Sequence, residues 1–264
     1  MPTTPNDPAS PVAAAPASPL SRVRHETRRR LQEVKDKLAL SANYLRLTLT
    51  GDLAGFISPG FDDHIKLFLH SADGEAVMRD FTPRRYDAVA NELDIDFALH
   101  EAGPASDWAR SASIGSTIEI GGPRGSMVIE DSFDWYVLVG DETALPAIAR
   151  RLGELRRGVP TAVVALVDGP ADEIDLPTLA ELHLTWVHRR AGQSVESVSR
   201  GLPRFAGEGF VWIAGEAAMA KAVRRVFVDE RHQPRGLIKA AGYWQQGSIG
   251  VHQVIEDEGA APKL

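Results

Sequence analysis

A short segment beginning at Arg79 carries side chains that could bind a phosphorylated aromatic ligand. Residues 79–84 read Arg-Asp-Phe-Thr-Pro-Arg. In an extended strand, residues 79, 81 and 83 point to one face and residues 80, 82 and 84 to the other. A cation, an aromatic ring and a hydroxyl thus lie within four residues. Arginine can hold a diphosphate bidentately, Phe81 can pack on a planar ring, and Thr82 can hydrogen-bond a ring nitrogen. On spacing alone, an ordinary strand with two exposed arginines is the simpler interpretation.

A turn at residues 103–106, Gly-Pro-Ala-Ser, precedes a pattern that predicts a short helix over 106–113. The first turn of a helix exposes unpaired N–H groups and the positive end of the helix dipole, and both favour a phosphate. Ser106 could add a hydroxyl donor, and it could equally be a simple helix cap, where serine is common. Trp108 is expected to pack.

Another turn, residues 140–146, reads Gly-Asp-Glu-Thr-Ala-Leu-Pro and lies between an apolar strand and a helix. It lacks the G-x-G-x-x-G fingerprint of the usual dinucleotide turn. Its amides and Thr143 could still meet a phosphate. Asp141 and Glu142 would repel a phosphate, so we expect them to face the planar ring or solvent.

A third turn, residues 214–219, reads Ala-Gly-Glu-Ala-Ala-Met and follows the last long apolar strand. Gly215 has no side chain, so the backbone there can approach a ligand closely. Met219 fits best as a core residue of the helix that follows.

Lys66 and Arg124 are candidates for attracting an anionic substrate. Lys66 lies between Ile65 and Leu67, so in a strand its side chain points away from theirs. Cations beside a site raise the local concentration of an anion and its encounter rate. Surface lysines are common, so the sequence alone favours ordinary solvated charge.

The composition limits the chemistry. The chain has 264 residues, a net charge of −7 and no cysteine. Disulfides and cysteine-ligated iron–sulfur clusters are excluded, so redox chemistry needs a bound organic cofactor. The acidic balance argues against a nucleic-acid binder. Histidine and carboxylate residues nowhere cluster at ligand spacing, so we expect no protein-bound metal.

The first 20 residues are rich in proline and alanine, with proline at positions 2, 5, 8 and 11. This spacing favours extended, solvated chain, so we predict a disordered tail over residues 1–20. The tail lacks the charged and apolar regions of a secretory signal, and no apolar run approaches the roughly 20 residues that span a bilayer. We therefore expect a cytoplasmic protein without a membrane segment.

Two different frameworks must position these groups. From about residue 31 to 121, short segments such as 45–49 alternate apolar and polar residues and are separated by glycine and proline turns. This pattern predicts an antiparallel barrel or sandwich.

From about residue 133, near-continuous apolar runs alternate with helical patterns, of which 147–157 and 219–230 are the clearest. Such runs are typical of parallel strands covered on both faces, and the series predicts a doubly wound α/β sheet. Ligands commonly bind between two such halves, so we expect the candidate groups to meet in that cleft. The runs are 135–140, 162–167, 184–187 and 210–215.

Several segments together resemble the siderophore-interacting protein family, within the ferredoxin–NADP reductase superfamily. Residues 79–84 resemble the Arg-x-Tyr-Thr/Ser-x-Arg motif of that superfamily. The other segments follow the order of the family and extend over about residues 30–250. They are 62–69, 93–109, 121–126, 140–150, 211–219 and 240–247.

This resemblance implies a β + α/β architecture: a six-stranded antiparallel FAD-binding barrel, which we place at residues 21–130, followed by a Rossmann-like NAD(P)-binding domain at 131–264. It implies a flavoprotein oxidoreductase of iron acquisition, an NAD(P)H-dependent ferric-siderophore reductase. FAD would take a hydride from NADH or NADPH and pass single electrons to ferric iron. Ferrous iron binds hard oxygen ligands less tightly and can leave.

The resemblance also implies residue roles. No side chain is expected to be catalytic, because the flavin mediates the chemistry. Lys66 and Arg124 match two basic substrate positions of the family, and Gln245 stands where a third would be. This departure argues against tight binding of highly anionic triscatecholates. The expected cofactor-binding residues are Arg79, Phe81, Thr82, Arg84, Phe97, His100, Ala105, Ser106, Asp141, Thr143, Gly215, Glu216 and Trp244.

Other interpretations stay open. The chain could be a related flavin-linked NAD(P)H reductase with another acceptor, or a siderophore-binding module without turnover. Asp168, at a strand end, would repel the 2′-phosphate of NADPH, whereas Arg189 and Arg190 would attract it. We expect a ferric siderophore as substrate, no nucleic-acid or membrane partner, and a monomer.

Deletion of residues 2–18 is expected to leave the melting temperature and the turnover rate nearly unchanged, because the tail has no apolar periodicity with which to pack. Thermal unfolding and NAD(P)H oxidation measure these two quantities. A clear loss of either would show that the tail docks on the folded protein.

Overall fold

The computed structural model describes residues 18–71, 73–100, 102–247 and 253–255. Most of the predicted tail, residues 1–17, lies outside the described residues, as do residues 256–264. The last residue assigned to the tail, Leu20, instead begins strand β1 (Leu20–Arg24).

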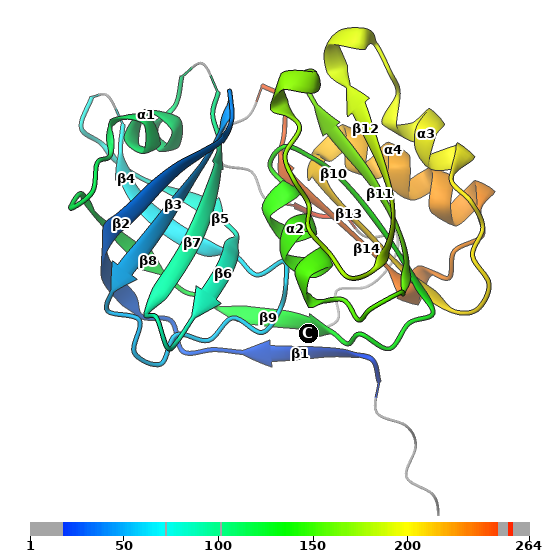
Figure 1. Ribbon diagram of the computed structural model, residues 1–264, viewed down its shortest axis with the longest axis horizontal. Helices are drawn as coiled ribbons and strands as arrows, with labels where there is room; N and C mark the ends of the chain where they lie inside the picture. The colour runs from blue at the N-terminus through cyan, green and yellow to red at the C-terminus, as the bar shows by residue number, and fades with distance from the viewer. Residues whose placement is uncertain (1–17, 72, 101, 248–252, 256–264) are drawn as a thin grey trace, which may run out of the picture.

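β1 pairs antiparallel with β9 (Gly125–Ile129) in a two-stranded ribbon. In Figure 1 this ribbon runs below the molecule, from the barrel on the left toward the parallel sheet on the right. It therefore bridges the two halves of the fold.

A curled antiparallel sheet forms the first half, as the alternating segments predict. Its strands are β2 (Arg29–Ser41), β3 (Tyr44–Gly51), β4 (Ile65–His70), β5 (Ala76–Phe81), β6 (Pro83–Asp87), β7 (Glu92–Ala98) and β8 (Thr117–Gly121). They lie in the order β5-β4-β8-β2-β3-β7-β6. In β4 the side chains of Ile65 and Leu67 are buried in the barrel core and Lys66 between them is not, as expected.

A single residue joins the two edges of this sheet. β5 ends at Phe81 and β6 begins at Pro83, so only Thr82 separates strands that stand at opposite ends of the order. β5 pairs with β4, whereas β6 pairs with β7. Counted as one bent strand, β5–β6 links both edges of the curled sheet and gives the six strands of the predicted barrel.

A β-bulge follows directly after this bend. Pro83 pairs with Ile95 and Arg85 pairs with Asp94, which leaves Arg84 as the extra residue. Bulges break the strict alternation of side chains along a strand. The expectation that alternate residues from 79 to 84 simply face opposite ways therefore fails at Arg84.

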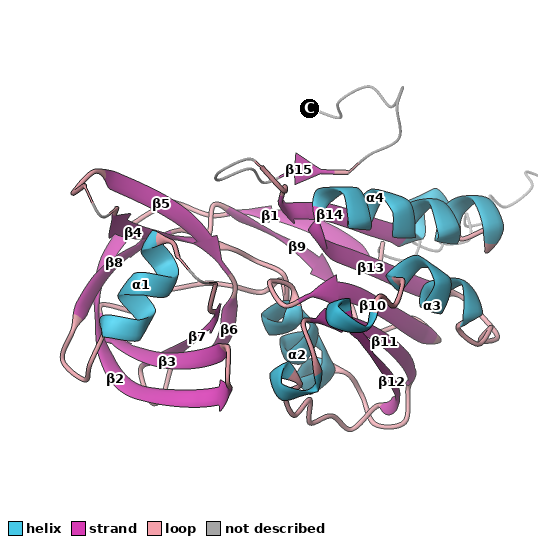
Figure 2. Ribbon diagram, turned by 90° about the horizontal axis from the view of Figure 1, so that it is seen from above, coloured by secondary structure: helices cyan, strands magenta, loops and turns pink. Residues whose placement is uncertain are grey.

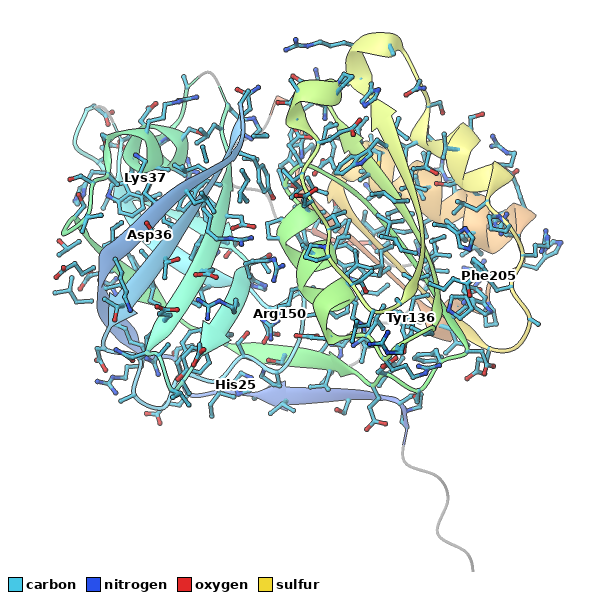
Figure 3. All side chains as sticks on the ribbon, in the orientation of Figure 1. His25, Asp36, Lys37, Tyr136, Arg150 and Phe205 are labelled. Carbon is cyan, nitrogen blue, oxygen red and sulfur yellow. The ribbon has the colours of Figure 1, made fainter. Side chains whose placement is uncertain are left out.

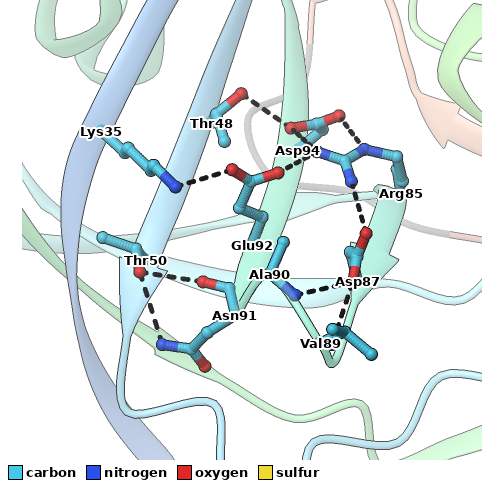
Figure 4. A network of polar contacts seen from close by, with 10 residues as sticks. All are labelled: Lys35, Thr48, Thr50, Arg85, Asp87, Val89, Ala90, Asn91, Glu92 and Asp94. Carbon is cyan, nitrogen blue, oxygen red and sulfur yellow. Dashed lines mark hydrogen bonds and ion pairs between the residues drawn. The ribbon is translucent and has the colours of Figure 1, made fainter.

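The residue after the bulge is fixed by a polar network on the barrel wall (Figure 4). The Arg85 guanidinium donates to Asp94 (Nε–Oδ2 2.7 Å) and to Glu92 (Nη2–Oε2 2.6 Å). Lys35 and Thr48 bind the same two carboxylates from neighbouring strands. The hydrogen bonds to Asp94 and Glu92 raise the pKa of Arg85. The Arg85 side chain therefore stabilises the barrel wall through Asp94 and Glu92.

The second half is the predicted doubly wound α/β sheet. Its strands are β10 (Trp135–Asp141), β11 (Pro160–Val167), β12 (Glu181–His188), β13 (Gly209–Glu216), β14 (Ile238–Trp244) and β15 (Gln253–Val254), in the order β12-β11-β10-β13-β14-β15. The pairings from β12 to β14 are parallel and β15 is antiparallel.

Helices cover both faces of this sheet (Figure 2). Helix α2 (Leu145–Glu154) packs on one face, in a cluster with Tyr136 and Leu138 of β10. Helices α3 (Val195–Gly201) and α4 (Ala217–Arg225) pack on the other, with Val137 and Val139. The helix predicted over 219–230 is α4 continued by a π-helical turn. The short turns are η1 (Pro170–Asp172), η2 (Arg189–Ala191), the π-turn η3 (Val226–Glu230) and η4 (Arg235–Leu237).

Arg150 of α2 connects the two halves (Figure 3). Its guanidinium donates to the Ser58 hydroxyl (3.0 Å), to the Ser58 carbonyl and to the Pro83 carbonyl (2.9 Å). The side chain is only 11% exposed. Because Pro83 follows the strand bend, α2 is attached to the corner that closes the barrel.

A buried carboxylate makes a second connection. Asp62, which precedes β4, accepts hydrogen bonds from the Trp212 indole (2.7 Å) and from Lys239 (2.6 Å). Both partners lie on strands of the parallel sheet. The Tyr44 hydroxyl of the barrel also donates to the Glu142 carbonyl (3.1 Å). The relative placement of the two halves is therefore fixed by polar contacts.

Replacing Arg150 by Ala should lower the free energy of unfolding by about 2–4 kcal/mol, because buried carbonyl acceptors lose a charged donor. Urea unfolding would measure this loss. Arg157→Ala removes an exposed arginine just beyond the same helix and is the matched control. Equal stability of the two variants would contradict the bridging role.

Candidate functional site

A cavity of about 480 Å³ lies where the barrel meets the parallel sheet. Its walls come from β4, β5, the first turn of α1 (Pro104–Ser111), and the segments that follow β10 and end β14. Many residues singled out in the sequence line this cavity: Lys66, Arg79, Phe81, Thr82, His100, Ala105, Ser106, Thr143 and Trp244. Others do not line it: Arg84, Phe97, Arg124, Asp141, Gly215 and Glu216.

The strand bend forms one wall. Thr82 is buried, and Phe81 packs on Phe97 with the ring centroids 4.6 Å apart. Phe97 is fully buried and also contacts Trp108. Phe97 therefore supports the wall from behind. Arg79 donates to the Met78 carbonyl (2.9 Å) and pairs with no carboxylate among the described residues, so its charge is available to a ligand.

The first turn of α1 forms the adjoining wall. The helix begins at Pro104, two residues earlier than predicted, and Gly103 is its N-cap with φ 141°. The capping role considered for Ser106 is therefore wrong. Its buried hydroxyl instead accepts a hydrogen bond from the His100 amide (3.1 Å). The first-turn backbone lines the cavity, where its unpaired amides suit an anion.

Arg84, the bulge residue, lies outside the cavity lining. Its Nε atom is buried without a hydrogen-bond partner among the described residues. Burial lowers the pKa of this guanidinium, and the carboxylate of Asp96 opposes that shift. The structure therefore does not bring Arg84 to the cavity with residues 79–82 of the same motif.

Asp141 organises the strand ends on the opposite side. Its fully buried carboxylate accepts from the Thr143 amide (2.9 Å) and hydroxyl (2.6 Å), the Glu216 amide (2.7 Å) and the Trp244 indole (2.8 Å). It therefore ties together the ends of β10, β13 and β14. The expectation that Asp141 faces a ring or solvent is wrong, because the buried carboxylate accepts hydrogen bonds from protein groups.

Glu142, in contrast, does line the cavity. Burial raises the pKa of Glu142, as does the neighbouring Asp141 carboxylate, and a hydrogen bond from Arg189 opposes both. The Arg189–Glu142 ion pair is 2.8 Å long. Arg189 also binds Asp168, so the three residues connect the cavity to the ends of β11 and β12.

Gly215 is required by packing within the protein. It has φ 137°, and a Cβ atom there would lie 2.5 Å from Asp141 Oδ2 and 2.7 Å from Met219 Cε. The neighbouring Glu216 is the N-cap of α4, and its carboxylate accepts from the Met219 amide (2.9 Å). Both residues shape the turn at the end of β13 and support the cavity indirectly.

The two candidate substrate cations are placed differently. Lys66 lines the cavity, and its ammonium pairs with Asp80 at 2.6 Å. Arg124 is exposed on the turn before β9 and does not line the cavity. Asp80 lies inside the 79–84 motif, but no sequence pattern indicates that it pairs with Lys66. Recognising its role requires the register of β4 against β5.

The described part of the chain contains neither a candidate metal-binding cluster nor a helix suited to span a membrane. No group of three or more His, Asp or Glu side chains there could hold a metal ion. No described helix is long and apolar enough to cross a membrane.

Two family models match the chain. The model for the siderophore-interacting FAD-binding domain matches residues 70–127, and the model for the siderophore-interacting protein matches residues 133–247. The first includes the strand bend and the start of α1, and the second includes the parallel sheet.

Curated relatives are similar over most of their length. The NADPH-dependent ferric-chelate reductase of Escherichia coli is 35% identical over 246 residues, which cover 84% of this chain and 95% of that protein. The ferric vibriobactin reductase of Vibrio cholerae is 31% identical over 243 residues, which cover 83% and 90%.

A solved structure supports the fold. A siderophore utilization protein from T. fusca superposes with a TM-score of 0.82 and 32% identity, covering 88% of this chain and 98% of that one. Among more distant structures, a cytochrome P450 reductase from Amycolatopsis superposes with a TM-score of 0.59 at 19% identity, which bears on the fold alone.

Asp141→Asn should lower the free energy of unfolding by about 2–4 kcal/mol, because an amide offers one acceptor oxygen where the carboxylate offers two. Trp244→Phe removes a single donor and should cost less, about 1 kcal/mol. Chemical unfolding of both variants, with the exposed Asp175→Asn as control, would measure these losses. A control that loses as much stability as Asp141→Asn would contradict the organising role.

Proposed function

Because the chain belongs to the siderophore-interacting protein family, we propose that it carries electrons from NAD(P)H through bound FAD to ferric siderophores and releases ferrous iron. One observation supports this most directly. A single cavity joins the Arg79–Thr82 bend, the α1 N-terminus and the end of the parallel sheet at Trp244. A flavin dinucleotide needs the first two, and a nicotinamide donor needs the third.

The residues present fit FAD. Arg79 has no carboxylate partner among the described residues and lines the same cavity as the first turn of α1, a combination that suits a diphosphate. Phe81 offers an apolar surface to a planar ring, and Thr82 a hydroxyl to its edge. Bound FAD would supply the conversion of a two-electron hydride into single electrons for iron. The protein holds and orients the ring and excludes water around it.

We assign the FAD-binding part to residues 21–130 and the NAD(P)-binding part to residues 131–264. The turn that follows β10 reaches the cavity, and ion pairs of Arg189 with Glu142 and Asp168 connect it to the ends of β11 and β12. Nucleotides commonly bind at this edge of open parallel sheets. Asp168 is paired with Arg189 and Arg190, so its repulsion of a 2′-phosphate is reduced. Either NADH or NADPH is therefore compatible with this edge.

We further propose that the protein acts in the cytoplasm, because NAD(P)H is available there, and that it is a monomer. Each proposed cofactor and substrate residue lies on one chain, so the site needs no second copy. Size-exclusion chromatography with light scattering tests the monomer directly.

Anaerobic absorbance of the purified protein tests the function. Flavin bands should bleach on addition of NADH or NADPH and return on addition of a ferric siderophore. If they returned only with quinones or free flavin, the chain would be a reductase with another acceptor. Absence of flavin bands, together with ferric siderophore binding, would identify a binding module.

Arg79→Ala should weaken FAD binding by about 1.5–3 kcal/mol, the value of a charge-assisted hydrogen bond. This corresponds to a roughly ten- to hundredfold higher Kd, measurable by flavin fluorescence during titration of apoprotein. Arg24→Ala removes an equally charged, exposed side chain on β1 and should have no effect. Unchanged retention of FAD by the Arg79 variant would count decisively against this assignment.

A further inference from the structure

Lys66, the candidate substrate residue that lines the cavity, forms an ion pair with Asp80. Lys66 and Asp80 face each other directly across β4 and β5, and Nζ lies 2.6 Å from Oδ2. Both residues line the cavity. The Lys66 side chain is 43% exposed and the Asp80 side chain 23%, so the pair lies at the cavity surface. An approaching ligand would meet it as a nearly neutral unit.

The second carboxylate oxygen of Asp80 is unused. Oδ1 is buried and accepts no hydrogen bond from the described residues. Among the described residues, Lys66 is the one donor to the Asp80 carboxylate. The negative charge of Asp80 is therefore opposed by the Lys66 ammonium alone.

The other charges of the cavity do not restore a positive field. Asp96 is held bidentately by Arg46 (2.6 and 2.8 Å), and Glu142 is held by Arg189 (2.8 Å). Among the described residues, Lys66 and Arg79 are the lysine and the arginine that line the cavity. Arg79 has no carboxylate partner among them, and FAD binding would use its positive charge. The position after Trp244 holds Gln245, which is exposed and uncharged. The lining carboxylates Asp80, Asp96 and Glu142 are thus each paired with a cation, and Lys66 adds no uncompensated positive charge.

We propose that Asp80 is a specificity-determining residue that cancels the charge of Lys66, so that the site favours ferric chelates of low net charge. This inference rests on the proposed function. Three singly charged hydroxamate groups neutralise ferric iron, whereas three doubly charged catecholate groups leave a trianion. A neutral trihydroxamate-type complex has no net charge for Lys66 to attract, so it loses nothing when Lys66 is paired. A trianion needs net attraction that this cavity does not provide.

The test compares two ferric complexes with the same iron donors. One is ferric tris(acetohydroxamate), which is neutral. The other is the complex of succinic monohydroxamate, which carries additional carboxylates away from the iron. The measured quantity is kcat/KM for the anionic complex divided by kcat/KM for the neutral one. This ratio is compared between wild type and Asp80→Asn, an uncharged variant of similar shape.

Asp80→Asn should raise this ratio roughly three- to tenfold at low salt, because it leaves Lys66 as an unpaired cation. The gain should shrink as ionic strength rises and the Debye length falls to ~8 Å and below. Glu230→Gln is the control, since it removes one negative charge from an exposed pair with Arg200 on the other half of the molecule. Its ratio should match wild type.

An unchanged ratio in Asp80→Asn, or an equal rise in Glu230→Gln, would overturn the proposal. Flavin content and anaerobic flavin reduction by NAD(P)H are measured alongside. If the Asp80 variant retains too little FAD, the salt dependence of wild type decides: a steep fall for the anionic complex alone would show an attractive site and refute the idea. A wild type that reduces neither complex, although NAD(P)H reduces its flavin, would contradict the proposed function itself.

Discussion

Closure of the barrel through Thr82 is the constraint on which the rest of the structure depends. The β5–β6 strand pairs first with β4 and then with β7, so it must bend at Thr82. The bend exposes Arg79 and Phe81 to the cavity while Thr82 stays buried. The same bend presents the Pro83 carbonyl to Arg150 of α2. One backbone corner thereby creates a wall of the site and an anchor for the parallel sheet.

The opposite wall depends on a buried charge. Asp141 has no solvent exposure, and burying a carboxylate is unfavourable unless several donors surround it. Here they come from the ends of three strands, through Thr143, Glu216 and Trp244. The arrangement fixes the position of Trp244 at the cavity. Asp62, buried between the halves, is likewise stabilised by donors, the Trp212 indole and the Lys239 ammonium.

Local patterns predicted much of the framework and part of the site. Alternation identified the barrel strands, and continuous apolar runs identified the parallel strands, because both patterns depend on near neighbours in the chain. The motif at 79–84 located one cavity wall. Three details were missed: the bulge at Arg84, the use of Asp141 by protein donors, and the pairing of Lys66 with Asp80. Each depends on which distant strand lies alongside.

The sequence by itself determined the two kinds of sheet, their order along the chain, and the family to which the motifs belong. These follow from side-chain periodicity and from short segments whose residues lie together in any extended or helical conformation. Only the tertiary structure decided which of the charges line the cavity and which of them are paired. The sequence predicts Lys66 as a solvated surface charge or a substrate-attracting one, because its partner is fourteen positions away. The register of β4 against β5 brings Lys66 Nζ within 2.6 Å of Asp80 Oδ2. The electrostatic potential at a site depends on all charges that lie nearby in space, and the order of residues along the chain does not show which charges those are.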